Sequence, residues 1–119
     1  DGFLYVADRV KDMIVTGGEN VYSIEVEQVL WRHEAVREVA VVGVPHPKWE
    51  ETPIAVVALE DGADVTADAL ISFARERLAH FKCPTRVEYV AELPRNATGK
   101  VLKKDLRKQF GGDESAVHR

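Results

Sequence analysis

The stretch Val39-Ala40-Val41-Val42-Gly43-Val44 is a continuous apolar run of β-prone residues near the middle of the chain. A run of this kind predicts a strand that is buried on both faces. Ile54 to Leu59 is a second such run, and Val87 to Val90 is a third, shorter one. Together the three runs predict a central sheet of roughly three strands.

Amphipathic segments flank these runs and predict helices. Residues 23 to 33 repeat apolar side chains at three- and four-residue spacing, and they begin with Ser23, a residue type that is favoured as an N-cap. Thr66 is expected to cap a second helix, with an inner face of Leu70, Ile71, Ala74 and Leu78. A third helix is expected to use Leu102, Leu106 and Phe110 and to stop at Gly111-Gly112.

The chain opens with two short β-prone segments, Phe3 to Val6 and Met13 to Val15, which are expected to pair as a hairpin. The glycine pair Gly17-Gly18 then interrupts the pattern. The resulting order of elements predicts a small α/β (α+β) domain of two layers. It has an N-terminal β-hairpin and a roughly three-stranded sheet that helices cover.

Composition limits the classes of function. A chain of 119 residues holds one domain, and its net charge of -4 gives no electrostatic case for binding nucleic acid. No apolar run is long enough to form a transmembrane helix. The lone Cys83 forms no internal disulfide, which fits a reducing, cytoplasmic location. The scattered histidines offer no spacing for a zinc site, so no metal is expected to be bound by this chain.

Three local features have a chemical and an ordinary interpretation. Lys100 follows Gly99 at a turn and suits a phosphate or carboxylate oxygen, but a solvated surface lysine is the common case. It is no P-loop lysine, because Pro94 and Val101 stand where that motif needs glycine and Ser or Thr. Trp49 either caps the core or offers a flat face to a purine base. Gly17-Gly18 is either a plain turn or backbone left bare for a narrow ligand.

Two long motifs in this sequence resemble signatures of the adenylate-forming enzymes. The first runs from Phe3 to Tyr22, and the second from Pro94 to Lys100. Residues 43–47 and 81–84 between them are also similar. The superfamily includes acyl-CoA synthetases, peptide-synthetase adenylation domains and firefly luciferase. The resemblance is strongest to acyl-CoA synthetases, or fatty-acid–CoA ligases. It implies that residues 1–112 are the small C-terminal domain of such an enzyme and that residues 113–119 are a flexible tail.

The resemblance implies an acid–thiol ligase reaction in two halves. A carboxylate first attacks the α-phosphate of ATP to give an acyl-adenylate, and the thiol of CoA then displaces AMP to give a thioester. The large N-terminal domain, which is absent from this sequence, would hold the ATP loop, the acyl pocket and, with the phosphates, the Mg²⁺ ion. The isolated chain is therefore expected to be inactive, and its partner is its own N-terminal domain. The resemblance also allows peripheral association with a membrane through that domain.

The resemblance also implies roles for individual residues. Lys100 matches the adenylation lysine, which holds the carboxylate and the α-phosphate, and Arg9 matches the arginine that contacts the AMP ribose. Lys11 matches the hinge about which the small domain rotates between the half-reactions. Residues near the CoA path are Gly17, Gly18, Trp49 and Phe81. The pattern from Pro94 to Lys100 also resembles a site of lysine acetylation, so an acetyltransferase and a deacetylase are candidate partners.

This sequence departs from the family pattern at two positions. Glu50 stands where a glycine commonly follows the tryptophan, and Thr85 stands where some ligases carry a basic residue. Two other interpretations remain open at this stage. One is an adenylation domain that loads the phosphopantetheine of a carrier protein, and the other is a non-catalytic module that binds a nucleotide or a protein. The acyl substrate is not specified by these residues.

Overall fold

The computed structural model describes residues 13–117, with side chains for residues 13–111. Five strands form one sheet, in which β4 lies between β3 on one side and β5 and β1 on the other. Strand β4 pairs antiparallel with β3 and β1 and parallel with β5. The strands are β1 (Met13–Thr16), β2 (Glu19–Tyr22), β3 (Val36–His46), β4 (Glu50–Leu59) and β5 (Arg86–Tyr89).

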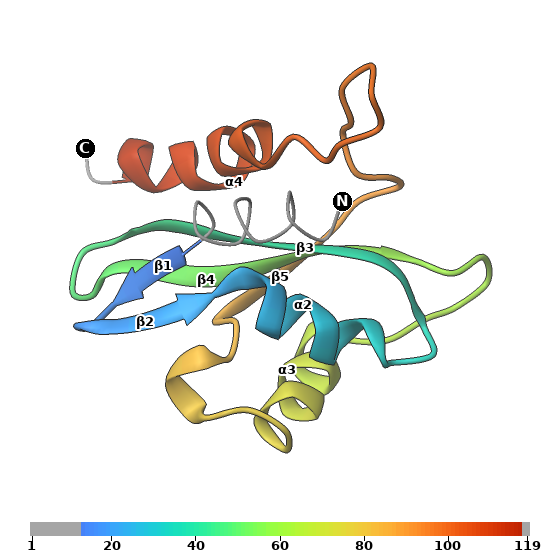
Figure 1. The fold of residues 1–119 in the computed structure, drawn as a ribbon, viewed down its shortest axis with the longest axis horizontal. Helices are drawn as coiled ribbons and strands as arrows, with labels where there is room; N and C mark the ends of the chain where they lie inside the picture. Colours follow the sequence, from blue (N-terminus) through green and yellow to red (C-terminus); the bar gives the residue numbers. More distant parts are fainter. Residues whose placement is uncertain (1–12, 118–119) are drawn as a thin grey trace.

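The helices cover both faces of this sheet, as Figure 1 shows with α4 on one side and α2 and α3 on the other. They are α2 (Ser23–Trp31), α3 (Ala67–Arg75) and α4 (Lys103–Val117), with a short 3-10 turn at His80–Lys82. The predicted α+β class is confirmed. The architecture has three layers, however, and the prediction of two was wrong.

Alternate residues of β3 explain the third layer. Val39 and Val41 point into a core shared with α2 and α3, whereas Ala40, Val42 and Val44 point into a second core under α4. Leu106 of α4 is fully buried in this second core. A strand that is apolar at every position needs a cover on both faces, because side chains alternate between them.

The described part of the chain contains a hairpin that was not predicted. Strand β1 pairs with β2, and the pattern break at Gly17-Gly18 is the turn between them. The predicted first strand, Phe3 to Val6, lies outside the described residues. The hairpin joins the sheet through a single pair, Thr16 with Glu50. It also packs on Gly43, where a Cβ atom would come within 3.0 Å of the Ile14 side chain.

Two predicted helix ends were wrong for physical reasons. Ser23 is the first residue of α2 and not its cap, and its hydroxyl instead accepts a hydrogen bond from Lys103 Nζ at 3.1 Å. Helix α4 continues through Gly111-Gly112 to Val117. Gly111 is there because α4 approaches β3 closely, since a Cβ atom would lie 3.0 Å from Val44 Cγ1. The predicted cap at Thr66 is confirmed, with Oγ1 accepting from the amide of Ala69.

Candidate functional site

A pocket of about 240 Å³ lies where the β1–β2 turn meets the β3–β4 turn. Its lining includes three residues that are distant in sequence and were predicted to lie near CoA: Gly17, Trp49 and Phe81. Threonine hydroxyls and one thiol complete much of the wall, from Thr16, Thr52, Thr85 and Cys83. Lysine and arginine are absent from the lining that the described residues form. The pocket therefore suits an uncharged, partly aromatic group better than a phosphate.

The two turns are tied together at the pocket. The amide of Gly17 donates to the carbonyl of Trp49 over 3.0 Å. Gly17 has a φ of +58°, and a Cβ atom added to it would lie 3.7 Å from the indole of Trp49. A side chain at this position would be strained and would point at the tryptophan. Gly18 also has positive φ, but it does not line the pocket.

Glu50 has the left-handed backbone that its position requires. Its φ is +71°, and the amide of Glu51 donates across it to the carbonyl of Trp49 at 2.8 Å. This is the pattern of a γ-turn with positive φ at its centre, which is strained for a residue that has a Cβ atom. Glu50 thus adopts a backbone conformation typical of the glycine that commonly follows the tryptophan.

The floor of the pocket is held by hydroxyl groups. Thr52 Oγ1 and Thr85 Oγ1 lie 2.9 Å apart, and the Thr85 amide donates to the carbonyl of Pro53 at 3.0 Å. Cys83 is buried beside them, and this burial raises the pKa of its thiol, which the charge of Arg75 lowers only in part. A thiol with a raised pKa is a poor nucleophile near neutral pH, so Cys83 acts as a wall residue.

Lys100 lies in the loop between β5 and α4, which projects on the α4 side of the sheet at the upper right of Figure 1. Arg95 and Val101 form an antiparallel bridge, and Asn96 to Gly99 make the turn between them, closed by a bond from the Gly99 amide to the Asn96 carbonyl at 2.9 Å. Gly99 has a φ of +88°. Lys100 follows this turn and is exposed.

The side chain of Asn96 organises the turn from within. Its Oδ1 accepts from the amide of Thr98 at 3.0 Å, from the Thr98 hydroxyl at 2.7 Å and from the amide of Lys100 at 3.0 Å. Arg95 fixes the loop to the sheet, because it donates to the carbonyl of Gly99 and to the carboxylate of Glu38 on β3. The backbone of Lys100 is therefore held by contacts that do not involve its own side chain.

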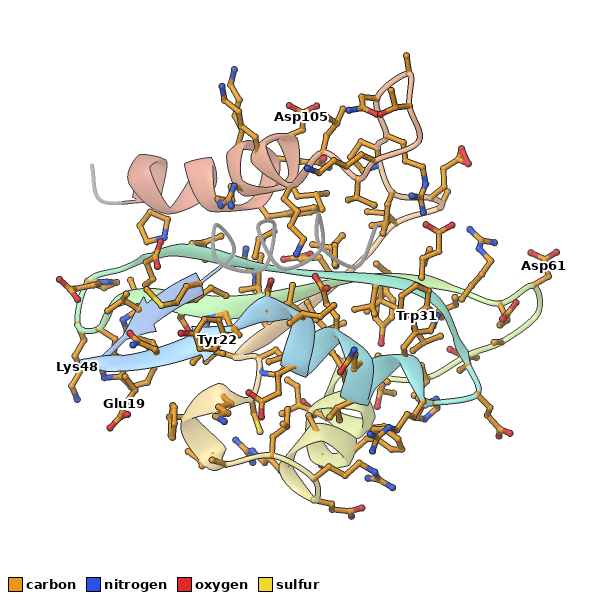
Figure 2. The ribbon with its side chains drawn as sticks, in the orientation of Figure 1. Glu19, Tyr22, Trp31, Lys48, Asp61 and Asp105 are labelled. Carbon is orange, nitrogen blue, oxygen red and sulfur yellow. The ribbon has the colours of Figure 1, made fainter. Side chains whose placement is uncertain are left out.

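The Lys100 loop and the pocket are far apart along the sheet. Glu38, which binds Arg95, pairs with Ala58 on β4, whereas Thr52 of β4 lines the pocket. Six residues of strand at roughly 3.3 Å each separate Ala58 from Thr52 by about 20 Å. Figure 2 shows Glu19 and Lys48 at the pocket end of the molecule, and Trp31 toward the other end.

A buried ion pair joins the start of α4 to α2. Lys103 Nζ lies 2.6 Å from Glu27 Oε2, with side chains that are 17% and 10% exposed. The same carboxylate oxygen accepts from the amide of Val41 on β3 at 2.9 Å. The pair therefore links two helices on opposite faces through the strand between them, close to where the Lys100 loop enters α4.

The family follows from comparison with known proteins. The profile of the family described as AMP-binding enzyme C-terminal domain matches residues 25–100. The chain belongs to this family. A peroxisomal butyrate–CoA ligase of Arabidopsis thaliana is 50% identical over 110 residues, which cover 90% of the chain and 19% of that relative.

Two solved structures carry the same domain. The Mycobacterium tuberculosis fatty acyl CoA synthetase matches with a TM-score of 0.82 and 42% identity, covering 88% of the chain and 21% of that structure. ATP-bound MatB from Rhodopseudomonas palustris matches with a TM-score of 0.83 and 39% identity, covering 86% and 20%. The AMP-binding C-terminal domain thus spans about a fifth of the length of these relatives.

The structure of this AMP-binding C-terminal domain sorts the predicted site residues into two places. Gly17, Trp49 and Phe81 line one pocket, whereas the loop of Lys100 is tied through Arg95 to Glu38, near the other end of the sheet. Arg9 and Lys11 lie outside the described residues. His46, which packs on Trp49, was missed, as was Asn96, although Asn and Gly at the ends of a turn are a signal that was present in the sequence.

Two further observations concern metals and membranes. Among the side chains described for residues 13–111, no three from His, Cys, Asp or Glu gather in a way that suits a metal ion. Within residues 13–117, the helices are too short or too polar to cross a membrane.

Proposed function

We propose that this AMP-binding C-terminal domain belongs to an ATP-dependent acyl-CoA ligase and that the two ends of its sheet serve the two half-reactions. The observation that supports this proposal most strongly is that two chemically different surfaces lie far apart on one sheet. One presents a lysine on a braced turn, and the other is a mostly uncharged pocket with aromatic walls. A single domain with two such ends suits a reaction whose two successive steps need different side chains.

In the first half-reaction, Lys100 holds oxygens of the carboxylate and of the α-phosphate of ATP. An ammonium group on a flexible stem gathers such oxygens as a point charge. Charge builds on the phosphate oxygens as the carboxylate attacks, so a fixed cation lowers the barrier. The braced backbone at Asn96 and Arg95 reduces the freedom that is lost when Lys100 closes on the substrate. Mg²⁺ is held by the phosphates and the large domain.

In the second half-reaction, the pocket receives CoA. Trp49 and Phe81 offer aromatic faces to the uncharged parts of the cofactor, and Gly17 keeps the entrance free of a side chain. The absence of lysine and arginine from the described lining fits this assignment, because the phosphates of CoA then remain outside the pocket.

The domain rotates between the halves so that each end of the sheet faces the large domain in turn. Lys11 is the hinge in this proposal, and Arg9 contacts the AMP ribose. Lysine acetylation at Lys100 would stop the first half by removing the charge. The exposure of Lys100 is compatible with access by a modifying enzyme.

The test uses the whole ligase that carries this domain, with Lys100→Ala and the exposed Lys104→Ala as its control. Carboxylate-dependent exchange of pyrophosphate into ATP reports the first half. We expect Lys100→Ala to lower its rate by about a hundred- to a thousandfold, as for loss of other fixed donors to a developing anion. Lys104→Ala should keep the full rate. Unchanged exchange in Lys100→Ala would contradict the proposal.

The acceptor is tested separately, because a carrier-protein thiol is the competing acceptor. The whole ligase is given preformed acyl-adenylate with either CoA or a phosphopantetheinylated carrier protein. We expect rapid thioester formation on CoA. Transfer to the carrier protein alone would keep the adenylation proposal and overturn the choice of CoA.

A further inference from the structure

The imidazole of His46 packs face to face on the indole of Trp49. The ring centroids are 4.4 Å apart, and the planes differ by 9°. His46 is the last residue of β3, and Trp49 comes just before β4. The two rings therefore stack across the turn that forms one wall of the pocket.

The same imidazole also holds the backbone of the turn. His46 Nδ1 accepts from the amide of Lys48 at 3.0 Å and from the amide of Trp49 at 3.3 Å. A ring nitrogen that accepts carries no proton, so this arrangement requires Nδ1 to be unprotonated. One side chain thus fixes both the main chain and the ring of Trp49.

Trp49 is only partly buried, so burial alone does not fix the orientation of its ring. The residue is 37% exposed, and its carbonyl accepts from the amides of Gly17 and Glu51. Those bonds fix the position of the backbone but leave the torsions of the side chain open. The stack with His46 selects the orientation of the indole, which lines the pocket.

We propose that His46 is a positioning residue, which holds the Trp49 indole ready to receive a flat uncharged group of the thiol substrate. The inference rests on the proposed function for the identity of that substrate. His46 itself makes no contact with the substrate in this account. It acts by preorganising the tryptophan, so its loss should affect binding of the thiol substrate and leave adenylation unchanged.

Two substitutions separate the two contacts. His46→Asn keeps an oxygen that accepts from the amides two and three residues ahead, as asparagine does in turns, but it has no ring to stack. His46→Phe keeps a ring and loses the acceptor. His33→Ala is the matched control, because His33 Nδ1 accepts from the Ala35 amide at 3.1 Å and its ring packs on Phe73, away from the pocket.

The first readout is independent of catalysis. In the 119-residue chain with Trp31→Phe, Trp49 is the only tryptophan, so its fluorescence reports this turn alone. We expect His46→Ala to raise the acrylamide quenching constant of Trp49 about twofold, because the stack covers one face of the indole. His33→Ala should leave it unchanged. No change in His46→Ala would overturn the positioning role, whatever the function of the domain.

The second readout is the KM for CoA in the whole ligase. We expect an increase of about tenfold for His46→Ala and of about two- to fivefold for His46→Asn and His46→Phe, with unchanged pyrophosphate exchange. An equal loss of both half-reactions would make the role merely structural and overturn the inference. If quenching rises while the KM for CoA stays unchanged, the pocket does not bind CoA. That result would overturn the proposed function of this end of the sheet.

Discussion

The amide of Gly17 and the carbonyl of Trp49 are joined by a hydrogen bond of 3.0 Å that couples two turns 32 residues apart in sequence. Both residues line the pocket. The bond also holds the backbone of Gly17, which has no side chain, beside the tryptophan.

Gly17→Ala should impair the thiol half-reaction and should also destabilise the domain. The left-handed backbone costs a residue with a Cβ atom about 1 kcal/mol, and the added methyl group points at the indole. We expect the KM for CoA to rise about tenfold, with unchanged pyrophosphate exchange. Steady-state kinetics of the whole ligase measure both.

Gly62→Ala is the matched control for this change. Gly62 has a φ of +78° and open space around it, so it carries the same backbone penalty away from the pocket. Its KM for CoA should equal that of the unaltered ligase. If the two variants behave alike, backbone strain and not the pocket explains the effect of Gly17→Ala.

Glu50→Gly should stabilise the domain by about 1 kcal/mol, because glycine adopts the left-handed conformation at φ +71° without the penalty of a Cβ atom. Urea denaturation of the 119-residue chain measures this. Glu50→Ala removes the same carboxylate but keeps the Cβ atom, so it should bring no gain. An equal gain in stability in both variants would show that the effect comes from loss of the Glu50 carboxylate and not from backbone strain.

Asn96→Ala should slow adenylation by about ten- to a hundredfold, because the turn that presents Lys100 loses the oxygen that accepts three hydrogen bonds. Asn96→Asp retains an accepting oxygen and should keep most of the rate. Pyrophosphate exchange in the whole ligase measures both variants. Normal pyrophosphate exchange in Asn96→Ala would show that Lys100 is positioned without the hydrogen bonds of the Asn96 side chain.

Lys103→Met should destabilise the fold by about 3 kcal/mol, because it removes the Lys103 ammonium group from its ion pair with the buried carboxylate of Glu27. The exposed Lys104→Met should change the free energy of unfolding by less than about 0.5 kcal/mol. Urea denaturation of the 119-residue chain compares them. The double variant Lys103→Met with Glu27→Gln should recover part of the loss, and an additive loss would contradict the pairing.

The apolar strands and the helices were predictable from sequence because local patterns specify them. The run from Val39 to Val44 correctly indicated burial on both faces, and this already requires three layers. The number of layers was nevertheless underestimated, because the pattern of the last helix does not say which face it covers. The roles of Ser23 and Gly111 depend on α4, which lies far from Ser23 in sequence and packs against β3.

The candidate site was less accessible to pattern reasoning. Gly17, Trp49 and Phe81 have no common spacing, so only the family resemblance associated them before the structure brought them to one pocket. His46 carried no signal of its own, since a histidine in a proline-containing turn is commonly a surface residue. Its contact with Trp49 depends on the register of the β3–β4 turn, in which His46 pairs with Glu50.

The most direct test of the central claim examines both ends of the sheet in the same whole ligase. Lys100→Ala and Trp49→Ala are each assayed for pyrophosphate exchange and for thioester formation from preformed acyl-adenylate and CoA. The account predicts that Lys100→Ala loses exchange and keeps thioester formation, and that Trp49→Ala shows the reverse. If each variant loses both halves to the same extent, the two ends do not serve separate steps and the account is wrong.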